Sequence, residues 1–391
     1  MAAACTLLLL GTTPILNSRA PTPDQLNAQE HKPQPATPSR GAGVERCGEG
    51  EDPVPAVAAP LSRAKEVLRV LSRMGLRDAR HRPVKRGGLL YIPVTDRELA
   101  AEAGFETAVV CAERSLRGAT FKGLLAERRE VPPEVLARIP GSFDIVGDIA
   151  LIELEPDVAE RYGSAVAKAI MELHPRVRAV YARGPTVGVE RVRVLRHIGG
   201  EERTVTVHRE YGISICVDIA HAYYNPSLAE EHRRIAELVR NGDRVLDMFA
   251  GVGPFALHIA KLRSATVIAI DINPYAIACL RRSLELNRLR GDVHPLEGDS
   301  RLADSMLRRV FSHVIMNLPH SSLEFLPVAL RLLEPGGALH IYLVAGSAEE
   351  ARRLVETRAG AAGWELRVVE VRRVLQYAPR RWIYRVSTCT A

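Results

Sequence analysis

The sequence predicts an α/β protein in which a C-terminal, mostly parallel sheet of seven strands follows two smaller domains, one α/β and one α+β. Three observations lead to this prediction. The chain has 391 residues, which is too long for one ordinary domain. From residue 204 onward, apolar strand-like runs alternate with helical runs, the pattern of a parallel sheet covered on both faces. Two shorter groups of helical and strand-like runs precede that region.

The charge balance favours a polyanionic partner. The formal net charge is +7. Residues 1–60 hold four basic and six acidic side chains, so residues 61–391 carry a net charge of +9. Each neutralised phosphate releases counterions, which makes nucleic acid a suitable partner, although ordinary solubility charge also accounts for the surplus. With 47% apolar and 25% charged residues, the composition is that of a globular protein without a membrane span.

The six cysteines form no CxxC pair and no Cys/His cluster at zinc-site spacing. We therefore expect a reducing compartment, the cytoplasm, and no bound metal. Cys216 and Cys279 lie in apolar runs and are expected in the core. The other four are Cys5, Cys47, Cys111 and Cys389.

Residues 1–60 are expected to be a disordered or misassigned N-terminal extension. They contain nine of the 25 prolines, and such a composition buries too little apolar area to offset the entropy of ordering. The apolar stretch 6–10 is short and lacks a basic leader, so it does not predict a secretory signal. An organellar transit peptide and a wrongly assigned start codon are both open, and we prefer the second.

The two small domains are expected at residues 61–115 and 116–203. In the first, a helical pattern over 62–75 precedes a glycine turn and a strand over 87–94. In the second, a strand over 143–154, a helix over 157–174 and two later strand-like runs indicate an α+β fold.

The third domain is expected at residues 204–391. Two strand-like runs and a helix over 228–239 lead into five parallel strands separated by helices. Two further strands flank Tyr377-Ala378-Pro379, which predicts an antiparallel hairpin at one edge of the sheet.

A glycine-containing loop follows the first strand of this sheet and predicts a nucleoside-type ligand. Asp247 ends the strand, and Gly251 and Gly253 follow, where glycine lets a ligand approach the backbone closely. Pro254 stands in place of a third glycine, which argues against a dinucleotide.

Acidic residues end the next two strands. Asp271 is placed to accept hydrogen bonds from the ribose hydroxyls of an adenosyl ligand, and Asp299 is placed near its adenine amino group. Because the carboxyl ends of parallel strands share one rim of the sheet, these residues are expected to lie together there.

The fourth strand ends in Asn317-Leu318-Pro319-His320, where many methyltransferases acting on nitrogen carry an Asn-Pro-Pro-Tyr-like tetrapeptide. A protonated ring nitrogen also needs a base to remove its proton. Glu231, in the segment just before the sheet, is a candidate base; its alternative is a solvated acid in a first helical turn.

Seven motifs occur in the order GxxRVR, HREYG, VDIAHAYYNPSL, DMFAGVGPF, AIDINPYAI, VIMNLPH and YAPR. In this combination residues 62–391 resemble the archaeal and eukaryotic type of tRNA (guanine37-N1)-methyltransferase. The resemblance implies a class I methyltransferase fold, S-adenosylmethionine as cofactor, and methyl transfer to N1 of guanosine 37. It further implies that the first domain grips the outer corner of tRNA while the other two hold the anticodon arm. We expect the protein to be a monomer.

The resemblance also implies roles for individual residues. Glu231 matches the general base and Arg191 matches the arginine that stabilises charge on guanine O6. Tyr223, Asn317 and Pro319 match positions that hold the target base. The residues implied at the cofactor are Asp247, Phe249, Gly251, Gly253, Asp271, Ile272, Asp299, Ser300 and Asn317.

Three positions depart from the family pattern: Ser227 and His320 replace basic residues, and Glu190 replaces an aromatic one beside Arg191. Glu190 gives Arg191 an alternative role in an ion pair. Alternatives for the whole chain are a wyosine-pathway transferase at the same nucleotide, which methylates a wyosine intermediate or transfers an aminocarboxypropyl group, and a tRNA-binding protein without catalysis. The intact loop and acids speak against the last.

Overall fold

The computed structural model describes residues 47–48, 50–78, 80–113, 120–187 and 192–390. The chain forms two compact units, divided after Arg129. We call them the N-terminal unit and the C-terminal unit. None of the helices in the described ranges is long and apolar enough to cross a membrane.

The N-terminal unit is built on an antiparallel sheet with the strand order β2-β3-β1-β4. A small core, which includes Leu71, Ile92 and Ala100, lies between the sheet and its helices. Its elements are β1 (Glu51–Pro60), α2 (Ala64–Arg73), β2 (Val84–Arg86), β3 (Leu89–Pro93), α3 (Arg97–Glu102), β4 (Thr107–Glu113) and α4 (Phe121–Glu127).

Strand β1 corrects the expectation that residues 1–60 are an extension, because residues 51–60 form a central strand of this sheet. Their prolines suggested disorder, since proline lacks the N–H that a paired strand donates. Pro53 and Pro55, however, lie where β1 pairs with β4 alone, and pairing with β3 begins at Ala56. Proline is tolerated at such an open strand side.

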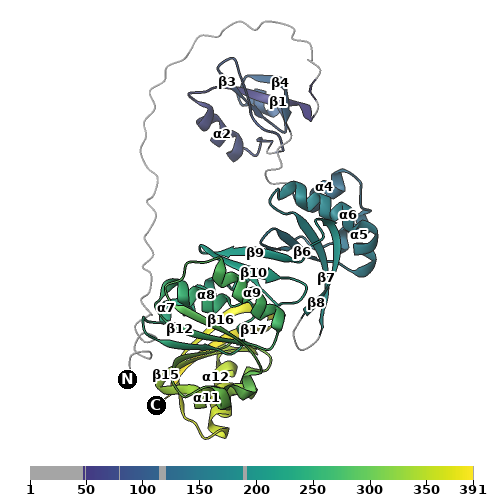
Figure 1. The fold of residues 1–391 in the computed structure, drawn as a ribbon. Coiled ribbons are helices and arrows are strands. Elements are labelled where there is room, and N and C mark those ends of the chain that lie inside the picture. Colours follow the sequence, from purple (N-terminus) through teal and green to yellow (C-terminus); the bar gives the residue numbers. More distant parts are fainter. Residues whose placement is uncertain (1–46, 49, 79, 114–119, 188–191, 391) are drawn as a thin grey trace, which may run out of the picture. The chain divides into compact units, whose positions relative to one another are not determined.

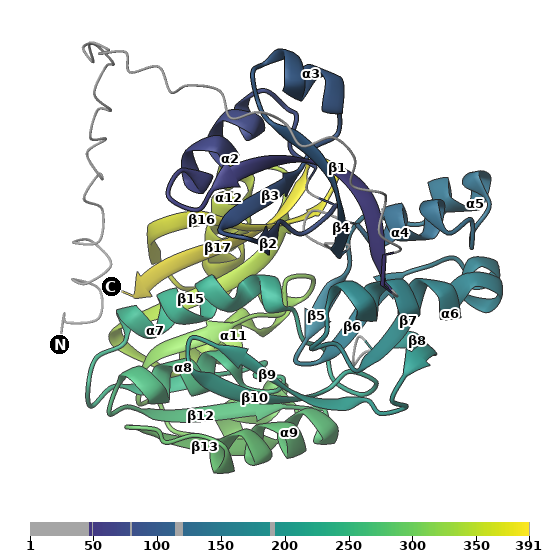
Figure 2. The ribbon, with the colours of Figure 1, turned by 90° about the horizontal axis from the view of Figure 1, so that it is seen from above.

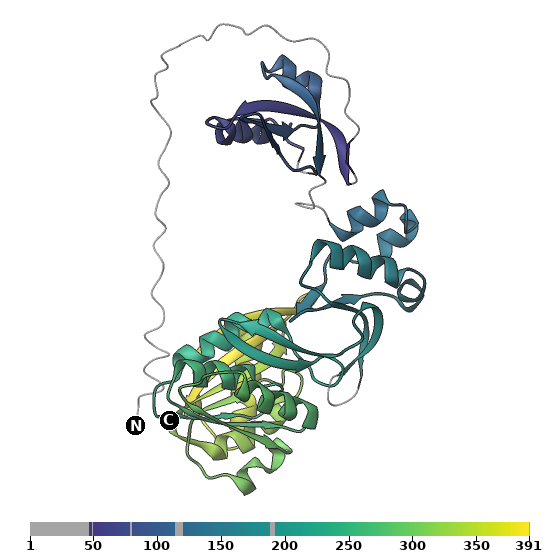
Figure 3. The same ribbon diagram turned by 45° about the horizontal axis from the view of Figure 1, so that its top comes forward.

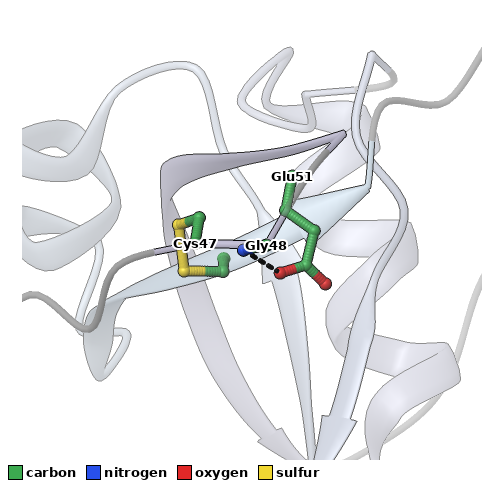
Figure 4. The surroundings of a disulfide bond; sticks show 4 residues. Cys47, Gly48 and Glu51 are labelled. Atoms are coloured by element: carbon green, nitrogen blue, oxygen red, sulfur yellow. Dashed lines mark hydrogen bonds between the residues drawn. A yellow bond between two sulfur atoms is a disulfide. The ribbon is translucent and has the colours of Figure 1, made fainter.

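A disulfide bond joins Cys47 and Cys111, whose Cα atoms lie 5.3 Å apart (Figure 4). The antiparallel register of β1 and β4 places Pro53 opposite Cys111. Beside the bond, the backbone N–H of Gly48 donates a hydrogen bond to the Glu51 carboxylate. The spacing of the cysteines did not predict this pair. A disulfide bond also differs from what we expected of a protein in a reducing compartment.

The C-terminal unit begins with a four-stranded sheet in the order β5-β6-β7-β8, and α6 packs on β7 and β8 (Figure 3). The single strand expected over 143–154 is a hairpin instead, because Gly147 adopts a φ of +60° between β5 and β6. A Cβ at Gly147 would lie 2.1 Å from Thr206 Oγ1. The elements are α5 (Pro133–Arg138), β5 (Asp144–Val146), β6 (Ile149–Glu153), α6 (Pro156–Leu173), β7 (Ala179–Val187) and β8 (Val192–Gly200).

A separate antiparallel hairpin, β9 (Val205–Glu210) and β10 (Ile213–Asp218), packs against helices α8 and α9 of the following sheet (Figure 2). Side chains of α9 and of the residues just after it hold β10 in place. Ser283 Oγ accepts a hydrogen bond from Cys216 N, and Asn287 exchanges two hydrogen bonds with the backbone of Ser214.

The predicted seven-stranded sheet is confirmed, with the order β13-β12-β11-β14-β15-β17-β16. Strands β11 to β15 are parallel, and β17 runs antiparallel to both β15 and β16. The strands are β11 (Arg244–Asp247), β12 (Thr266–Asp271), β13 (Asp292–Glu297), β14 (Phe311–Met316), β15 (Leu333–Ala345), β16 (Leu366–Ala378) and β17 (Arg381–Thr390).

Two hydrophobic cores lie on opposite faces of this sheet. Helices α7, α8 and α9 contribute to one, and α11 and α12 contribute to the other (Figure 1). The helical elements are η1 (Pro226–Leu228), α7 (Ala229–Leu238), α8 (Pro254–Leu262), α9 (Pro274–Glu285), η2 (Ser300–Leu302), α10 (Ala303–Met306), α11 (Ser322–Leu332) and α12 (Ala348–Ala361).

Candidate active site

The glycine loop after β11 has the conformation that its sequence predicts. Gly251 and Gly253 adopt φ values of +55° and +80°, which favour glycine. A Cβ at Gly253 would lie 2.2 Å from Leu280 Cδ1, so this glycine is also required for packing against α9. At Gly251 a Cβ would meet, among the described residues, only Tyr223 O, at 3.8 Å, so these residues leave open space above the loop.

Asp247, at the end of β11, is a fully buried carboxyl group. Neither of its oxygens has a hydrogen-bond partner within the described residues. Burial, together with the nearby charge of Asp271, raises the pKa of Asp247 to about 7. An unpartnered buried carboxyl group is costly, and it is a common mark of a ligand site.

Asp271, at the end of β12, is tied to the glycine loop. Its Oδ2 accepts a hydrogen bond of 2.7 Å from Gly251 N, and its Oδ1 accepts one of 2.9 Å from Asn273 N. Asn273 caps α9 and donates to the backbone oxygen of His221, which lies in the segment before the sheet. The neighbouring Ile272 is half exposed and offers an apolar surface beside the carboxylate.

Asp299 and Ser300 lie after β13. Ser300 Oγ donates a 2.5 Å hydrogen bond to Met248 O, which fixes this turn to the strand end at β11. Asp299 accepts hydrogen bonds from the backbone N–H and the guanidinium of Arg301, which lower its pKa. Its carboxylate therefore already has partners.

Phe249 packs edge-on against Phe325 of α11.

Asn317, Pro319 and His320 lie in the turn between β14 and α11. The turn is held to β15, since Val344 N donates to Pro319 O, and Ser322 Oγ lies 2.6 Å from Tyr342 O. Met316 pairs with Ile341, so Asn317 follows directly at the carboxyl end of β14, while Tyr342 is the next residue of β15, three residues before that strand ends.

His320 also lies edge-on to the ring of Tyr377, with the ring centroids 4.9 Å apart. Tyr377 belongs to β16 and is half exposed. The turn after β14 is thereby bordered by an aromatic pair.

Glu231 is not a solvated acid, because only 6% of its side chain is exposed. It lies in the first turn of α7. Its Oε1 accepts hydrogen bonds from Tyr342 Oη at 2.9 Å and from Arg385 Nη1 at 2.6 Å. The alternative of a solvent-facing carboxylate in a first helical turn is therefore wrong.

Glu210, the acid of the HREYG motif, connects three parts of the site. Its Oε2 lies 2.9 Å from His232 Nδ1 of α7 and 2.9 Å from His258 Nε2 of α8, and its Oε1 accepts from Tyr224 Oη. Burial would raise the pKa of Glu210, but these hydrogen bonds hold it below its ordinary value. The ring nitrogens of the two histidines and the Glu210 carboxylate oxygen lie within 4.8 Å of one another. The contacts between the carboxylate and the two rings have the length of hydrogen bonds.

Tyr223, next to Tyr224, is partly exposed, and its backbone oxygen lies beside Gly251. Ser227 is exposed, and its N–H donates to the Asn225 side chain that caps η1. Arg191 and Glu190 lie outside the described residues.

Comparison with known proteins identifies the family. The family model of the TRM5/TYW2 methyltransferase domain matches residues 206–367, and that of the TYW2 N-terminal domain matches residues 122–204. The tRNA (guanine(37)-N(1))-methyltransferase Trm5b of Pyrococcus abyssi is 36% identical over 333 residues, which are 84% of this chain and 96% of that protein. The chain belongs to the TRM5/TYW2 methyltransferase family.

Two further similarities agree with this assignment. Trm5b of Methanocaldococcus jannaschii is 33% identical over 329 residues, which are 82% of this chain and 94% of that protein. A solved complex of aTrm5 and tRNALeu matches with a TM-score of 0.69 and 30% identity, over 86% of this chain and 99% of that chain. As a TRM5/TYW2 methyltransferase, the protein uses S-adenosylmethionine, as the resemblance implied.

The residues at the strand ends fit this cofactor. The unpartnered Asp247 carboxyl suits the ammonium group of the methionine moiety, and the open side of Gly251 accommodates close approach of the ligand. Asp271 has the acceptor chemistry for ribose hydroxyls.

Sequence reasoning missed Tyr342, Arg385 and the role of Glu210. An arginine inside the apolar strand WIYRVST was a usable signal, because a buried guanidinium needs an acidic partner. Nothing near Arg385 in the sequence identified that partner as Glu231.

Proposed function

We propose that this TRM5/TYW2 methyltransferase transfers the methyl group of S-adenosylmethionine to N1 of guanosine 37 in tRNA. The observation that carries the proposal is the similarity to the two archaeal Trm5b proteins, which are named for that reaction and match over almost their whole length. The solved aTrm5 complex with tRNALeu supports tRNA as the partner.

Glu231 is proposed as the general base. N1 of neutral guanine carries a proton and becomes a good nucleophile only when that proton leaves. Bound S-adenosylmethionine supplies an electrophilic methyl group. The Glu231 carboxylate is shielded from water and accepts a hydrogen bond from Tyr342. Tyr342 follows Ile341, the residue of β15 that pairs with Met316, and Met316 directly precedes Asn317. This position near the rim supports the role.

Arg191, Tyr223, Asn317 and Pro319 are proposed to hold the target base. For Arg191, a guanidinium near O6 would stabilise the negative charge that develops there as N1 loses its proton. The backbone oxygen of Tyr223 lies beside Gly251 of the glycine loop, and Asn317 directly follows strand β14. Both positions support roles in binding the base.

For tRNA binding, we propose that the small domain expected at 61–115 binds the outer corner and that the later domains hold the anticodon arm. The basic run at 80–86 supports this through charge. Its charges are partly paired, however: Arg80 and His81 contact Asp78, and Arg82 contacts Glu113. A monomeric state and a cytoplasmic location remain predictions.

The rival is a wyosine-pathway reaction at the same nucleotide. The match of residues 122–204 to the TYW2 N-terminal domain favours it, since that family model belongs to the related branch. The two reactions differ in which group leaves the cofactor, so product analysis separates them.

The experiment measures methyl transfer from labelled cofactor to an unmodified tRNA transcript with guanosine at position 37, beside the same transcript with adenosine there. Wild type is compared with Glu231→Gln, which keeps the size of the side chain but removes the base. We expect guanosine-dependent transfer in wild type and a loss of about 100-fold or more in the variant, the scale of general-base catalysis.

Transfer to both transcripts would contradict position 37, and an unimpaired Glu231→Gln would contradict the base. Activity only on a transcript carrying a wyosine precursor would support the rival.

A further inference from the structure

A row of side chains on the sheet fixes one oxygen of Glu231. Tyr342 of β15 and Arg385 of β17 are directly opposite each other in the antiparallel register. Both donate hydrogen bonds to Glu231 Oε1, at 2.9 Å and 2.6 Å. Arg385 is fully buried, and its other terminal nitrogen donates to Glu370 of β16. Oε1 is therefore held from two strands.

The second oxygen, Oε2, is in a different position. Among the described residues, its nearest cationic groups are Arg372 Nε at 3.9 Å and Arg234 Nε at 4.0 Å, both beyond hydrogen-bond distance. At these distances neither guanidinium occupies a lone pair of Oε2. Only this oxygen is left able to accept a proton.

Both donors to Oε1 keep their protons. Burial and the charge of Glu231 raise the pKa of Tyr342 well above its ordinary value. Burial would lower the pKa of Arg385, but the charges of Glu231 and Glu370 raise it overall. Tyr342 and Arg385 therefore both keep their protons at neutral pH.

We propose that Tyr342 and Arg385 are positioning residues for the base: they hold Oε1, so that Oε2 is the oxygen that accepts the proton of the target nitrogen. This inference rests on the proposed role of Glu231. In the step it describes, the N1–H bond of guanine breaks and the proton passes to Oε2. The electron pair left on N1 forms the new N–C bond as the C–S bond of the sulfonium breaks, and its electrons stay on sulfur.

The test uses Tyr342→Phe, which removes one donor without changing shape, and Arg385→Lys, which keeps the charge but cannot bridge two carboxylates. The matched control is Tyr384→Phe, the same substitution on β17 but in the core on the opposite face of the sheet. Single-turnover methylation of the guanosine 37 transcript at saturating cofactor and tRNA is measured with the full chain, beside the dissociation constants of both ligands and the thermal midpoint.

We expect Tyr342→Phe and Arg385→Lys to slow the single-turnover step by about 10- to 100-fold, the effect of losing a hydrogen bond to a charged group. Both dissociation constants should stay within about threefold of wild type, and Tyr384→Phe should react at the wild-type rate. If Arg385→Lys does not fold, Tyr342→Phe decides alone.

A Tyr342→Phe enzyme with the wild-type single-turnover rate would overturn the proposal. Weakened cofactor binding in step with the rate would also overturn it, since that result indicates a structural role. If Glu231→Gln is inactive while Tyr342→Phe is fully active, only the positioning inference fails. If Glu231→Gln is itself fully active, the proposed base fails.

Discussion

Asp247 is a buried acid at the proposed cofactor site. Its carboxyl is fully buried without a hydrogen-bond partner among the described residues, and its pKa is raised from 3.8 to about 7. Such a group stabilises the fold below its unfolded pKa of 3.8 and loses that contribution as pH rises through about 7. The folded protein therefore tolerates a destabilising charge at the place where we propose that the cofactor binds.

We predict that Asp247→Asn stabilises the free protein at pH 8 more than at pH 5, because the amide carries no charge to bury. The same change should weaken cofactor binding by about tenfold or more, the worth of one charged hydrogen bond. Urea unfolding at the two pH values and calorimetric titration with S-adenosylmethionine check both parts. An equal effect on stability at pH 5 and pH 8, or unchanged affinity, would contradict the prediction.

At the residue scale, the strand-end residues were predictable, whereas the hydrogen-bond partners of Glu231 were not. Asp247, Gly251 and Asp271 could be placed because strand ends in a parallel sheet share a rim, and short sequence patterns mark those ends. Arg385 and Glu231 are 154 residues apart, and only the insertion of β17 beside β15 brings them together. No local pattern encodes such a contact.

At the element scale, strands β14, β15 and β17 share a buried polar row below the site. His313 and His340 stack with centroids 5.5 Å apart, His340 Nδ1 lies 3.0 Å from Ser387 Oγ, and Asp243 lies 3.3 Å from His313. Burial, with the charges of His313 and Arg385, lowers the pKa of His340 well below 6.5. The sheet therefore holds His340 neutral.

This geometry predicts a loss of stability in mild acid. The unfolded chain takes up the proton first, so the contribution of His340 is present above about pH 6.5 and declines as pH falls below that value. His208 and His232, whose pKa values are also lowered by burial, act in the same direction. Replacing His340 by leucine should reduce the slope of unfolding free energy between pH 6 and 5 by up to about 1.4 kcal/mol per pH unit.

Denaturant titrations at several pH values measure that slope for wild type and His340→Leu. Ser387→Ala, which keeps the histidine, is the control and should retain the slope. Equal slopes in wild type and His340→Leu would show that the histidine is not what couples the sheet to pH.

Helices and strands were predictable where hydrophobic runs alternate regularly along the chain. The prediction was wrong where a single residue determines the direction of the backbone. The seven-stranded sheet follows from its alternating runs. The hairpin of β5 and β6 depends on Gly147 alone, which turns an apparently continuous strand where Thr206 leaves no room for a side chain. Strand β1 was missed because its prolines resemble a disordered segment, and only the one-sided pairing with β4 makes them acceptable.

At the scale of the whole molecule, the Cys47–Cys111 bond belongs to the N-terminal unit alone. It closes a loop with a sequence separation of 64 residues, which corresponds to about 4 kcal/mol of chain entropy removed from the unfolded state. A double Cys47→Ser/Cys111→Ser variant should therefore destabilise this unit selectively.

Hydrogen exchange of β1 and β4, measured by mass spectrometry in wild type and the double variant, checks this prediction. Both tryptophans, Trp364 and Trp382, lie in the C-terminal unit, so their fluorescence provides an internal control that should not change. Unaltered exchange in β1 and β4 would mean that the bond contributes nothing to stability.

The position of β17 has a consequence for synthesis on the ribosome. It is the most C-terminal of the described strands, yet it lies between β15 and β16 and carries Arg385 to Glu231. While the chain is still emerging, β15 and β16 exist without the strand that joins them, and the carboxylate of Glu231 has no cation at Oε1. A nascent chain stopped before residue 381 therefore contains the glycine loop but lacks Arg385, one of the two donors to Glu231 Oε1. The contacts that we propose to orient Glu231 are therefore complete only after β17 has joined the sheet.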